Sequence, residues 1–267
     1  MIKAKKSLGQ NFLKDEAVLN RIISSAKLSK DDVVLEIGPG QGALTEKLAA
    51  ACKKVVAIEL DDRLIEPLHT KFRGNENVGI LHGDILKLNL PELIEKELKI
   101  NNVREYKVVA NIPYYITAPI IRLFLETKIV PSEVIFMVQK EVAERITAKK
   151  GAMSILAVSV QYYAKVQFLF TVFKESFEPI PKVDSAIIHI TRNMDHGSKN
   201  AQDVKKFFRI VKSGFSAKRK TLINNLSNSL QLDKKELEEK LSSLGFNANV
   251  RAQELGVDDW KKLTKLI

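Results

Sequence analysis

Strand-like and helix-like segments alternate through the first two thirds of the sequence, and this alternation restricts the fold more than any other feature. Five short apolar runs have strand character: 33–38, 55–60, 78–84, 107–112 and 133–139. Segments of helical character, such as GALTEKLAAACK, lie between them. This order is typical of a parallel sheet with helices on both faces. Two later runs, 166–173 and 185–191, would add a hairpin, so we expect an α/β fold with a seven-stranded, mostly parallel sheet.

The last part of the chain follows a different pattern. Residues 192–200, RNMDHGSKN, are polar and rich in turn formers, and helical periodicity follows them. We therefore predict two domains. The first, over residues 1–192, is the α/β domain and begins with a basic segment over 1–14. The second, over residues 200–267, is small and all-helical.

Basic residues are unevenly distributed in this chain of net charge +11. Residues 199–267 alone hold 15 Lys/Arg against 8 Asp/Glu. Basic clusters that interleave with aromatic residues favour a polyanionic partner such as RNA. The candidates for contact with RNA phosphates are Lys5, Lys6, Lys212, Lys218, Arg219 and Lys220. A solvated helix surface remains the alternative for the last three.

Several classes of protein are disfavoured by what the sequence lacks. No apolar run approaches the roughly 18–20 residues of a membrane span, and MIKAKKSLGQ has no apolar stretch typical of a signal peptide. Cys52 is the only cysteine, and the four histidines have no metal-ligand spacing. We therefore expect a soluble, cytoplasmic protein without a metal. We also expect it to be a monomer.

A glycine-rich turn follows the first strand-like run, in LEIGPGQGALTEKL. Gly38, Gly40 and Gly42 would let a ligand approach the backbone closely, and Glu59 ends the next run 21 residues after Gly38. In a parallel sheet this arrangement predicts a nucleoside at the carboxyl ends of both strands, with Glu59 accepting the ribose hydroxyls. A plain tight turn is the alternative interpretation.

Two cofactors fit such a turn, a dinucleotide and S-adenosylmethionine, because the glycine spacing alone does not separate them. Pro39 has no N–H, so the loop lacks a donor that a pyrophosphate would use. Glu36 places a carboxylate just before the turn, which repels phosphate but suits an ammonium or sulfonium group. Both residues favour S-adenosylmethionine, which carries these two cations and no phosphate.

Asp84 closes the third strand-like run, in HGDIL. Its carboxylate could accept a hydrogen bond from the adenine amino group of the cofactor, and it could equally cap a helix. Together with Gly38 and Glu59 at the two preceding strand ends, Asp84 favours the cofactor site.

The fourth strand-like run ends unusually, in VVANIPYYIT. Asn111 would lie beside the cofactor, where its Oδ1 and the Ile112 carbonyl could accept both N–H groups of an exocyclic amine. Such an amine is a poor nucleophile because its lone pair is delocalised, and two acceptors favour a pyramidal nitrogen. Pro113 would shape the turn, and Tyr114 would stack a base drawn out of its helix or loop. Methyl transfer from a cation then needs mainly positioning.

These motifs resemble those of one family, the ribosomal RNA adenine N6,N6-dimethyltransferases. NIPYYITAPII resembles the family's acceptor motif. Further blocks resemble family sequences in the expected order: KKSLGQNFL (5–13), EIGPGQGALTEKL (36–48), FEPIPKVDSAII (177–188), FSAKRKTLINNL (215–226) and RAQELGVDDWKKL. The resemblance covers essentially the whole chain. It implies a Rossmann-like class I methyltransferase domain with a small helical C-terminal domain that binds RNA or the subunit.

The resemblance also implies roles for residues at matching positions. Asn11 and Leu13 would contact the cofactor from the N-terminal segment, in a pocket completed by Gly38, Gly40, Glu59, Asp84 and Asn111. Phe177 would form the second aromatic wall around the flipped adenine, opposite Tyr114. A core aromatic that anchors its loop is the alternative for Phe177.

Two branches of the family differ in their RNA. FEPIPKVDSAII and AKRKTLINNL resemble the branch that modifies two adjacent adenines of small-subunit RNA in an immature subunit. NIPYYITAPI departs from the Ile-Ser-Thr ending that is typical of the other branch, which modifies a large-subunit adenine and confers antibiotic resistance. We therefore expect a small-subunit enzyme. A non-catalytic assembly factor with the same fold is the hypothesis from another class.

Overall fold

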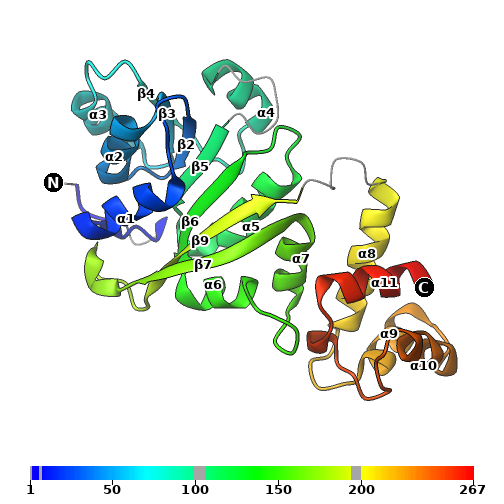
Figure 1. The fold of residues 1–267 in the computed structure, drawn as a ribbon. Helices are drawn as coiled ribbons and strands as arrows, with labels where there is room; N and C mark the ends of the chain where they lie inside the picture. Colours follow the sequence, from blue (N-terminus) through cyan, green and yellow to red (C-terminus); the bar gives the residue numbers. More distant parts are fainter. Residues whose placement is uncertain (1, 6–7, 99–105, 194–199) are drawn as a thin grey trace. The chain divides into compact units, whose positions relative to one another are not determined.

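The computed structural model describes residues 2–5, 8–98, 106–193 and 200–267, which form two compact units. Unit 1 comprises Met1–Ala143 and Val166–Arg192, and unit 2 comprises Glu144–Lys165 and Asn193–Ile267 (Figure 1). The predicted division at 192–200 differs from this in one respect, because residues 144–165 belong to unit 2.

A seven-stranded sheet forms the centre of unit 1, in the order β4-β3-β2-β5-β6-β9-β7 (Figure 1). The strands are β2 (Val33–Ile37), β3 (Lys54–Glu59), β4 (Val78–His82), β5 (Tyr106–Asn111), β6 (Glu133–Gln139), β7 (Ala164–Val172) and β9 (Ser185–Arg192). Strands β4, β3, β2, β5 and β6 are parallel, and β9 is antiparallel to β6. The predicted seven-stranded, mostly parallel sheet is confirmed.

Helices cover both faces of this sheet. The helices of the α/β region are α1 (Glu16–Ala26), α2 (Ala43–Ala51), α3 (Asp62–Lys71), α4 (Leu90–Leu93), α5 (Thr117–Glu126) and α6 (Lys140–Ile146). Leu19 of α1 and Leu48 of α2 belong to one buried cluster with Val55 and Ile135 of the sheet. Phe136 points to the opposite face, where its ring meets Phe124 of α5 at 6.0 Å.

The register of the parallel strands brings the polar strand ends together. Ile37 of β2 pairs with Ile58 of β3 and with Ala110 of β5, and Glu59 pairs with His82 of β4. The carboxyl ends of four adjacent strands therefore lie along one edge of the sheet. The residues that immediately follow them are placed to form a single site.

A second, two-stranded sheet joins distant parts of unit 1. Strand β1 (Phe12–Leu13) pairs antiparallel with β8 (Phe177–Glu178), with Leu13 opposite Phe177. The Lys14 N–H also donates to the Ser176 carbonyl at 2.9 Å. This sheet holds the N-terminal segment in place.

Unit 2 is a helical bundle around a buried Trp260. Its helices are α7 (Ile155–Tyr163), α8 (Ala201–Gly214), α9 (Leu222–Leu230), α10 (Lys234–Ser243) and α11 (Val257–Leu266). Tyr162 of α7 packs against Phe207 of α8, with ring centroids 4.2 Å apart. The apolar side chains of α7 thus complete the core of the helical unit, which explains why residues 144–165 belong to it. In the part of the chain that the structure describes, no helix is long and apolar enough to cross a membrane.

Candidate cofactor and acceptor site

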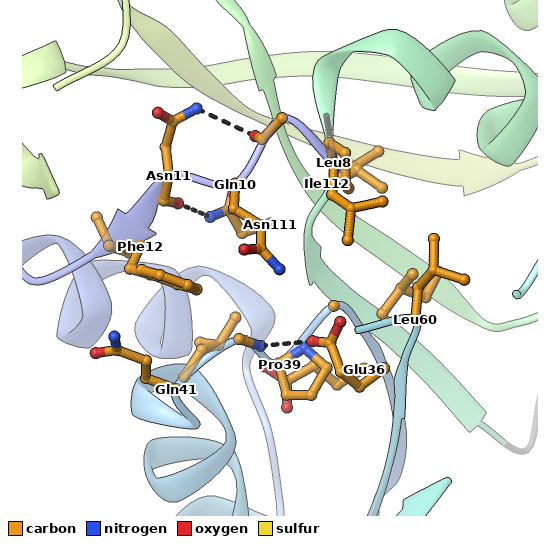
Figure 2. A pocket seen from close by; sticks show the side chains of 18 of the residues that line it. Leu8, Gln10, Asn11, Phe12, Glu36, Pro39, Gln41, Leu60, Asn111 and Ile112 are labelled. Atoms are coloured by element: carbon orange, nitrogen blue, oxygen red, sulfur yellow. Dashed lines mark hydrogen bonds between the residues drawn. The ribbon is translucent and has the colours of Figure 1, made fainter. Parts of the chain in front are cut away.

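A pocket of about 420 Å³ lies in unit 1 at the carboxyl ends of the parallel strands (Figure 2). Five segments contribute most of its lining, residues 8–14, 36–41 with 43–44, 58–60, 83–85 and 111–116, and Glu16, Leu19 and Lys71 complete it. This volume is within the range of sites for small molecules and cofactors. The pocket unites four strand ends with the N-terminal segment and contains Gly38, Glu59, Asp84 and Asn111. That these residues bind a cofactor stays a prediction.

The glycine-rich turn forms one wall of the pocket. Gly38, Gly40 and Gly42 all adopt positive φ angles, of 66°, 59° and 76°. A side chain at Gly40 would bring its Cβ within 3.0 Å of the Phe12 ring, and one at Gly42 within 2.8 Å of the Phe72 ring. The backbone conformation favours glycine at all three positions, and close packing adds to this requirement at Gly40 and Gly42.

We expect Gly42→Ala to destabilise the fold by about 2–4 kcal/mol, because it adds a steric overlap to the backbone strain. Gly74→Ala is the matched control, since Gly74 also has a positive φ, of 87°, but has open space around it. The control should lose only about 1 kcal/mol. Thermal unfolding of both variants measures the difference, and equal losses would show that the Phe72 contact contributes nothing.

Glu59 ends β3 and is 5% exposed. Its two carboxylate oxygens accept the N–H groups of Gly40 at 3.0 Å and Asp61 at 2.8 Å. Burial raises the pKa of Glu59, and these two hydrogen bonds oppose the increase. The carboxylate is held in one orientation, and each oxygen retains a lone pair for a ribose hydroxyl.

Glu36 lies on the same wall, at 1% exposure. Its Oε2 has no hydrogen-bond partner among the described residues. Burial raises the pKa of Glu36 to about 8. A buried carboxyl oxygen without a partner at a pocket wall fits a ligand that brings a cation or a donor, as S-adenosylmethionine does.

Asp84 follows β4 and lines the pocket beside Gly83. Its Oδ1 accepts the Leu86 N–H at 3.0 Å, so the carboxylate also caps a local turn. A capping role for Asp84 is therefore compatible with a role as an acceptor for the adenine amino group of a cofactor.

Asn111 ends β5 and lines the pocket together with Ile112. The Asn111 Nδ2 donates to the Asn11 carbonyl at 3.4 Å, and the Asn11 side chain donates to the Gly9 carbonyl at 3.2 Å (Figure 2). The amide is thereby oriented with its Nδ2 engaged. Within the described residues, no hydrogen bond reaches the Asn111 Oδ1 or the Ile112 carbonyl, which leaves both as acceptors.

Tyr114 also lines the pocket, and its hydroxyl lies 2.7 Å from the Ser185 hydroxyl at the start of β9. Burial raises the pKa of Tyr114, so the phenol stays neutral. Pro113 begins the short helical turn Tyr114–Ile116, whose Ile116 N–H donates to the Pro113 carbonyl at 3.2 Å. The Tyr114 side chain is thus held at its hydroxyl by Ser185 and at its backbone by the helical turn.

Phe177 differs from the exposed aromatic wall suggested by the family resemblance. It is 3% exposed, belongs to the same buried cluster as Leu13, and is not among the residues that line the pocket. The structure places it as a core aromatic that anchors its loop. A contact between Phe177 and a flipped base stays a prediction.

The basic candidates fall in both units of the chain. Lys5 is exposed in unit 1, and Lys6 lies outside the described residues. Lys212 is exposed near the end of α8, and Lys218, Arg219 and Lys220 are exposed in the turn between α8 and α9. The last four candidates therefore come from one end of α8 in unit 2.

Sequence reasoning did not find several residues that shape the pocket. Gln10 donates to Asp61 at 2.8 Å, which ties the N-terminal segment to the end of β3. The Arg63 guanidinium holds the pKa of Asp61 well below its usual range. Leu60 and Lys71 also line the pocket. The sequence offered one signal for the three of these residues that line the pocket, which is that each lies next to a residue of the site or of its packing. Gln10 precedes Asn11, Leu60 follows Glu59, and Lys71 precedes Phe72, which packs on Gly42.

The donor set of the pocket fits S-adenosylmethionine, with buried carboxylates for its cations and ribose. Among the described residues, no three His, Cys, Asp or Glu side chains gather as a metal site. The structure thus offers oxygen acceptors and backbone groups to a ligand of this kind.

Comparison with known proteins gives a consistent result. The family model described as ribosomal RNA adenine dimethylase matches residues 1–267. A protein of Fusobacterium nucleatum named ribosomal RNA small subunit methyltransferase A is 43% identical over 267 residues, covering 99% of this chain and 97% of the relative. A Dehalococcoides mccartyi protein of the same name is 42% identical and covers 98% of this chain and 88% of the relative.

Two solved structures are similar over nearly the whole chain. A dimethyladenosine transferase from Plasmodium falciparum has a TM-score of 0.77 at 28% identity, with 94% of this chain and 95% of that chain covered. The 23S rRNA methyltransferase ErmE also has a TM-score of 0.77, at 26% identity, with 96% and 99% covered. The fold alone therefore does not distinguish the two RNA specificities, whereas the more similar sequences carry the small-subunit name.

Proposed function

Because this chain belongs to the ribosomal RNA adenine dimethylase family, we propose that it dimethylates N6 of two adjacent adenines in a small-subunit hairpin loop. It is an S-adenosylmethionine-dependent enzyme that acts on adenine in small-subunit ribosomal RNA. The blocks FEPIPKVDSAII and AKRKTLINNL support the pair of adenines as its target. We further propose that it acts as a monomer on the immature subunit in the cytoplasm.

The cofactor would be held along the edge of the sheet. Gly38 and Gly40 would let its amino-acid part approach the backbone, Glu59 would accept the ribose hydroxyls, and Asp84 would accept the adenine amino group. Asn11 and Leu13 would cover it from the N-terminal segment, since both line the pocket. When bound, S-adenosylmethionine supplies an electrophilic methyl carbon on a cationic sulfur.

Asn111 and Ile112 would prepare the acceptor amine. The Asn111 amide is oriented by its bond to Asn11, so its Oδ1 can accept one N–H of adenine N6 while the Ile112 carbonyl accepts the other. This arrangement favours a pyramidal nitrogen whose lone pair points at the methyl carbon. The proton that the product nitrogen loses passes to water, so no strong base is required.

Tyr114 would hold the flipped base by stacking, which is typically worth about 1–3 kcal/mol per base. Its hydroxyl is fixed on Ser185, so the ring is presented in a set orientation. Phe177 lies in the core, as described above. Its proposed role as the opposite wall would require the β1–β8 sheet or its loop to move.

The turn between α8 and α9 would contact RNA phosphates. Asn225 is 2% exposed and donates to the carbonyls of Gly214 at 2.6 Å and Ala217 at 3.0 Å, which fixes the start of this turn. Lys218, Arg219 and Lys220 are thus displayed from a rigid support, which lowers the entropy cost of binding. Contacts of this kind position RNA without reading its sequence.

We expect replacement of Lys218, Arg219 and Lys220 by alanine to weaken binding to small-subunit RNA while cofactor affinity stays unchanged. Loss of three phosphate contacts should also reduce the slope of log K against log salt by about 2. Titration of RNA at several salt concentrations measures this slope. The matched control is alanine at Lys234, Lys235 and Lys240 of α10, which should leave the slope unchanged, and an unchanged slope in the turn variant would refute the contact.

The observation that carries the proposed function is the meeting of Asn111–Tyr114 with Gly38, Glu59 and Asp84 in one pocket. The test is mass mapping of methyl groups after incubation with immature small subunits and S-adenosylmethionine. We expect two methyl groups on each of two adjacent adenines. Modification of a large-subunit adenine instead would contradict the proposed specificity. RNA that stays unmodified would contradict the proposed methyltransferase activity.

A further inference from the structure

Glu36 is a buried carboxyl group at the wall of the pocket that the methyl transfer described above does not use. It lies on β2, immediately before the glycine turn, and is 1% exposed. Its Oε2 has no hydrogen-bond partner among the described residues. A buried carboxylate oxygen without a partner is strongly destabilising while it carries a charge.

Glu59 provides an internal comparison, because it is a buried carboxyl group on the same wall. Both of its oxygens accept backbone N–H groups, from Gly40 and Asp61. Such hydrogen bonds favour the charged form. Among the described residues, no backbone N–H group donates to the Glu36 Oε2. The charge of Glu59 also makes a charge on Glu36 less favourable.

The surroundings of Glu36 offer little to stabilise an anion. Glu59 of β3 lines the same pocket, and its charge raises the pKa of Glu36. Within the described part of the chain, the Thr45 hydroxyl of α2 is itself buried without a hydrogen-bond partner at standard distance, and it lies close enough to Glu36 to lower the pKa. The charge of Lys71 on α3 also lowers the pKa of Glu36, but the Lys71 Nζ already pairs with Glu46 at 3.0 Å and with the Gly42 carbonyl at 3.2 Å. Burial dominates and raises the pKa of Glu36 to about 8. In the free protein at pH 7, Glu36 is therefore mainly protonated.

We propose that Glu36 is neutral in the free enzyme and ionises when a cationic group of the cofactor enters the pocket, so that cofactor binding releases one proton. This inference rests on the proposed placement of S-adenosylmethionine along residues 36–44. The bond that breaks is the carboxyl O–H of Glu36, and its proton passes to solvent. The cofactor cation takes its place as the partner of the carboxylate.

The sign of the pH effect follows from this exchange. Below a pKa of about 8, protons compete with the cofactor for Glu36, so affinity should rise with pH. Between pH 6 and pH 7 the dissociation constant should fall about tenfold, because one proton is released per cofactor bound. The amino group of the cofactor stays largely protonated in this range, so the proton comes from the protein.

Calorimetric titration at pH 6.5 in buffers of different ionisation enthalpy measures the protons released. We expect about one proton for the wild-type enzyme with S-adenosylmethionine, and none for Glu36→Gln. The affinity of Glu36→Gln should not change between pH 6 and pH 7. The matched control is Glu66→Gln, an exposed acid of α3 that does not line the pocket, which should release the same proton as the wild type.

Two related ligands identify the cation that Glu36 meets. S-adenosylhomocysteine has the ammonium but no sulfonium, and 5′-methylthioadenosine has neither. Release with S-adenosylhomocysteine assigns the ammonium, and release with S-adenosylmethionine alone assigns the sulfonium; both results support the proposal. Release with 5′-methylthioadenosine, or none with wild-type enzyme and S-adenosylmethionine, overturns it. Methylation of the RNA is measured separately, so the enzyme's function can stand while this coupling fails.

Discussion

Replacing Asn111 with alanine should lower the rate of methyl transfer by about 100- to 1,000-fold while binding to the immature small subunit persists. The loss is expected because the variant removes Oδ1, one of two acceptors that orient the adenine amine, and single positioning groups of this kind have effects of that size. It also removes the bond to the Asn11 carbonyl, so cofactor affinity should fall by a smaller factor. Transfer of labelled methyl groups and co-sedimentation with subunits measure the two effects.

Asn20→Ala is the control for this experiment, because Asn20 is exposed on α1, away from the pocket lining. It should retain full activity. If Asn111→Ala methylates RNA at the wild-type rate, the acceptor role is refuted. If the wild-type chain binds subunits and never methylates them, the chain is an assembly factor that keeps the fold.

Replacing Glu59 with alanine should weaken binding of S-adenosylmethionine by at least about 100-fold. Two hydrogen bonds from ribose hydroxyls to a carboxylate are lost, each worth about 1.5–3 kcal/mol. The variant also leaves the N–H groups of Gly40 and Asp61 without their acceptor, so the glycine turn loses its orientation. Equilibrium dialysis with labelled cofactor measures the change directly.

Glu66→Ala, an exposed acid on α3, is the matched control and should bind the cofactor normally. Glu59→Gln should have an intermediate affinity, since one oxygen acceptor remains. Thermal unfolding of each variant separates loss of the ribose contact from loss of the fold. If Glu59→Ala binds the cofactor nearly as tightly as the wild type, the proposed contact between Glu59 and the ribose is refuted.

The sheet and the site at its edge were accessible from sequence because their signals are local. Each buried strand is a short apolar run, and the side chains that matter stand where such a run ends. Glu59 and Asn111 could therefore be placed at one edge from strand order alone. The glycines of the turn are similarly informative, because backbone positions with positive φ angles are usually occupied by glycine.

Other features could not be predicted because they depend on contacts between distant segments. Strand β1 has two residues and pairs with another two-residue strand, so neither has a periodic pattern. The burial of Phe177 follows from that pairing, and its aromatic character alone did not distinguish a core position from an exposed wall. Helix α7 is apolar on nearly all sides, and only the packing of Tyr162 against Phe207 reveals that it belongs with unit 2.

The small β1–β8 sheet has a consequence for how the enzyme comes into being. Its two strands are Phe12–Leu13 and Phe177–Glu178, so the strand pairing that holds Leu13 cannot form until residue 178 has left the ribosome that makes the chain. Chains are synthesised from the N-terminus, and long-range strand pairing must wait for both partners. A truncated nascent chain that ends before β8 therefore lacks a complete cofactor wall, although it already contains Gly38, Glu59, Asp84 and Asn111. The enzyme should therefore reach its full cofactor affinity late in its own translation.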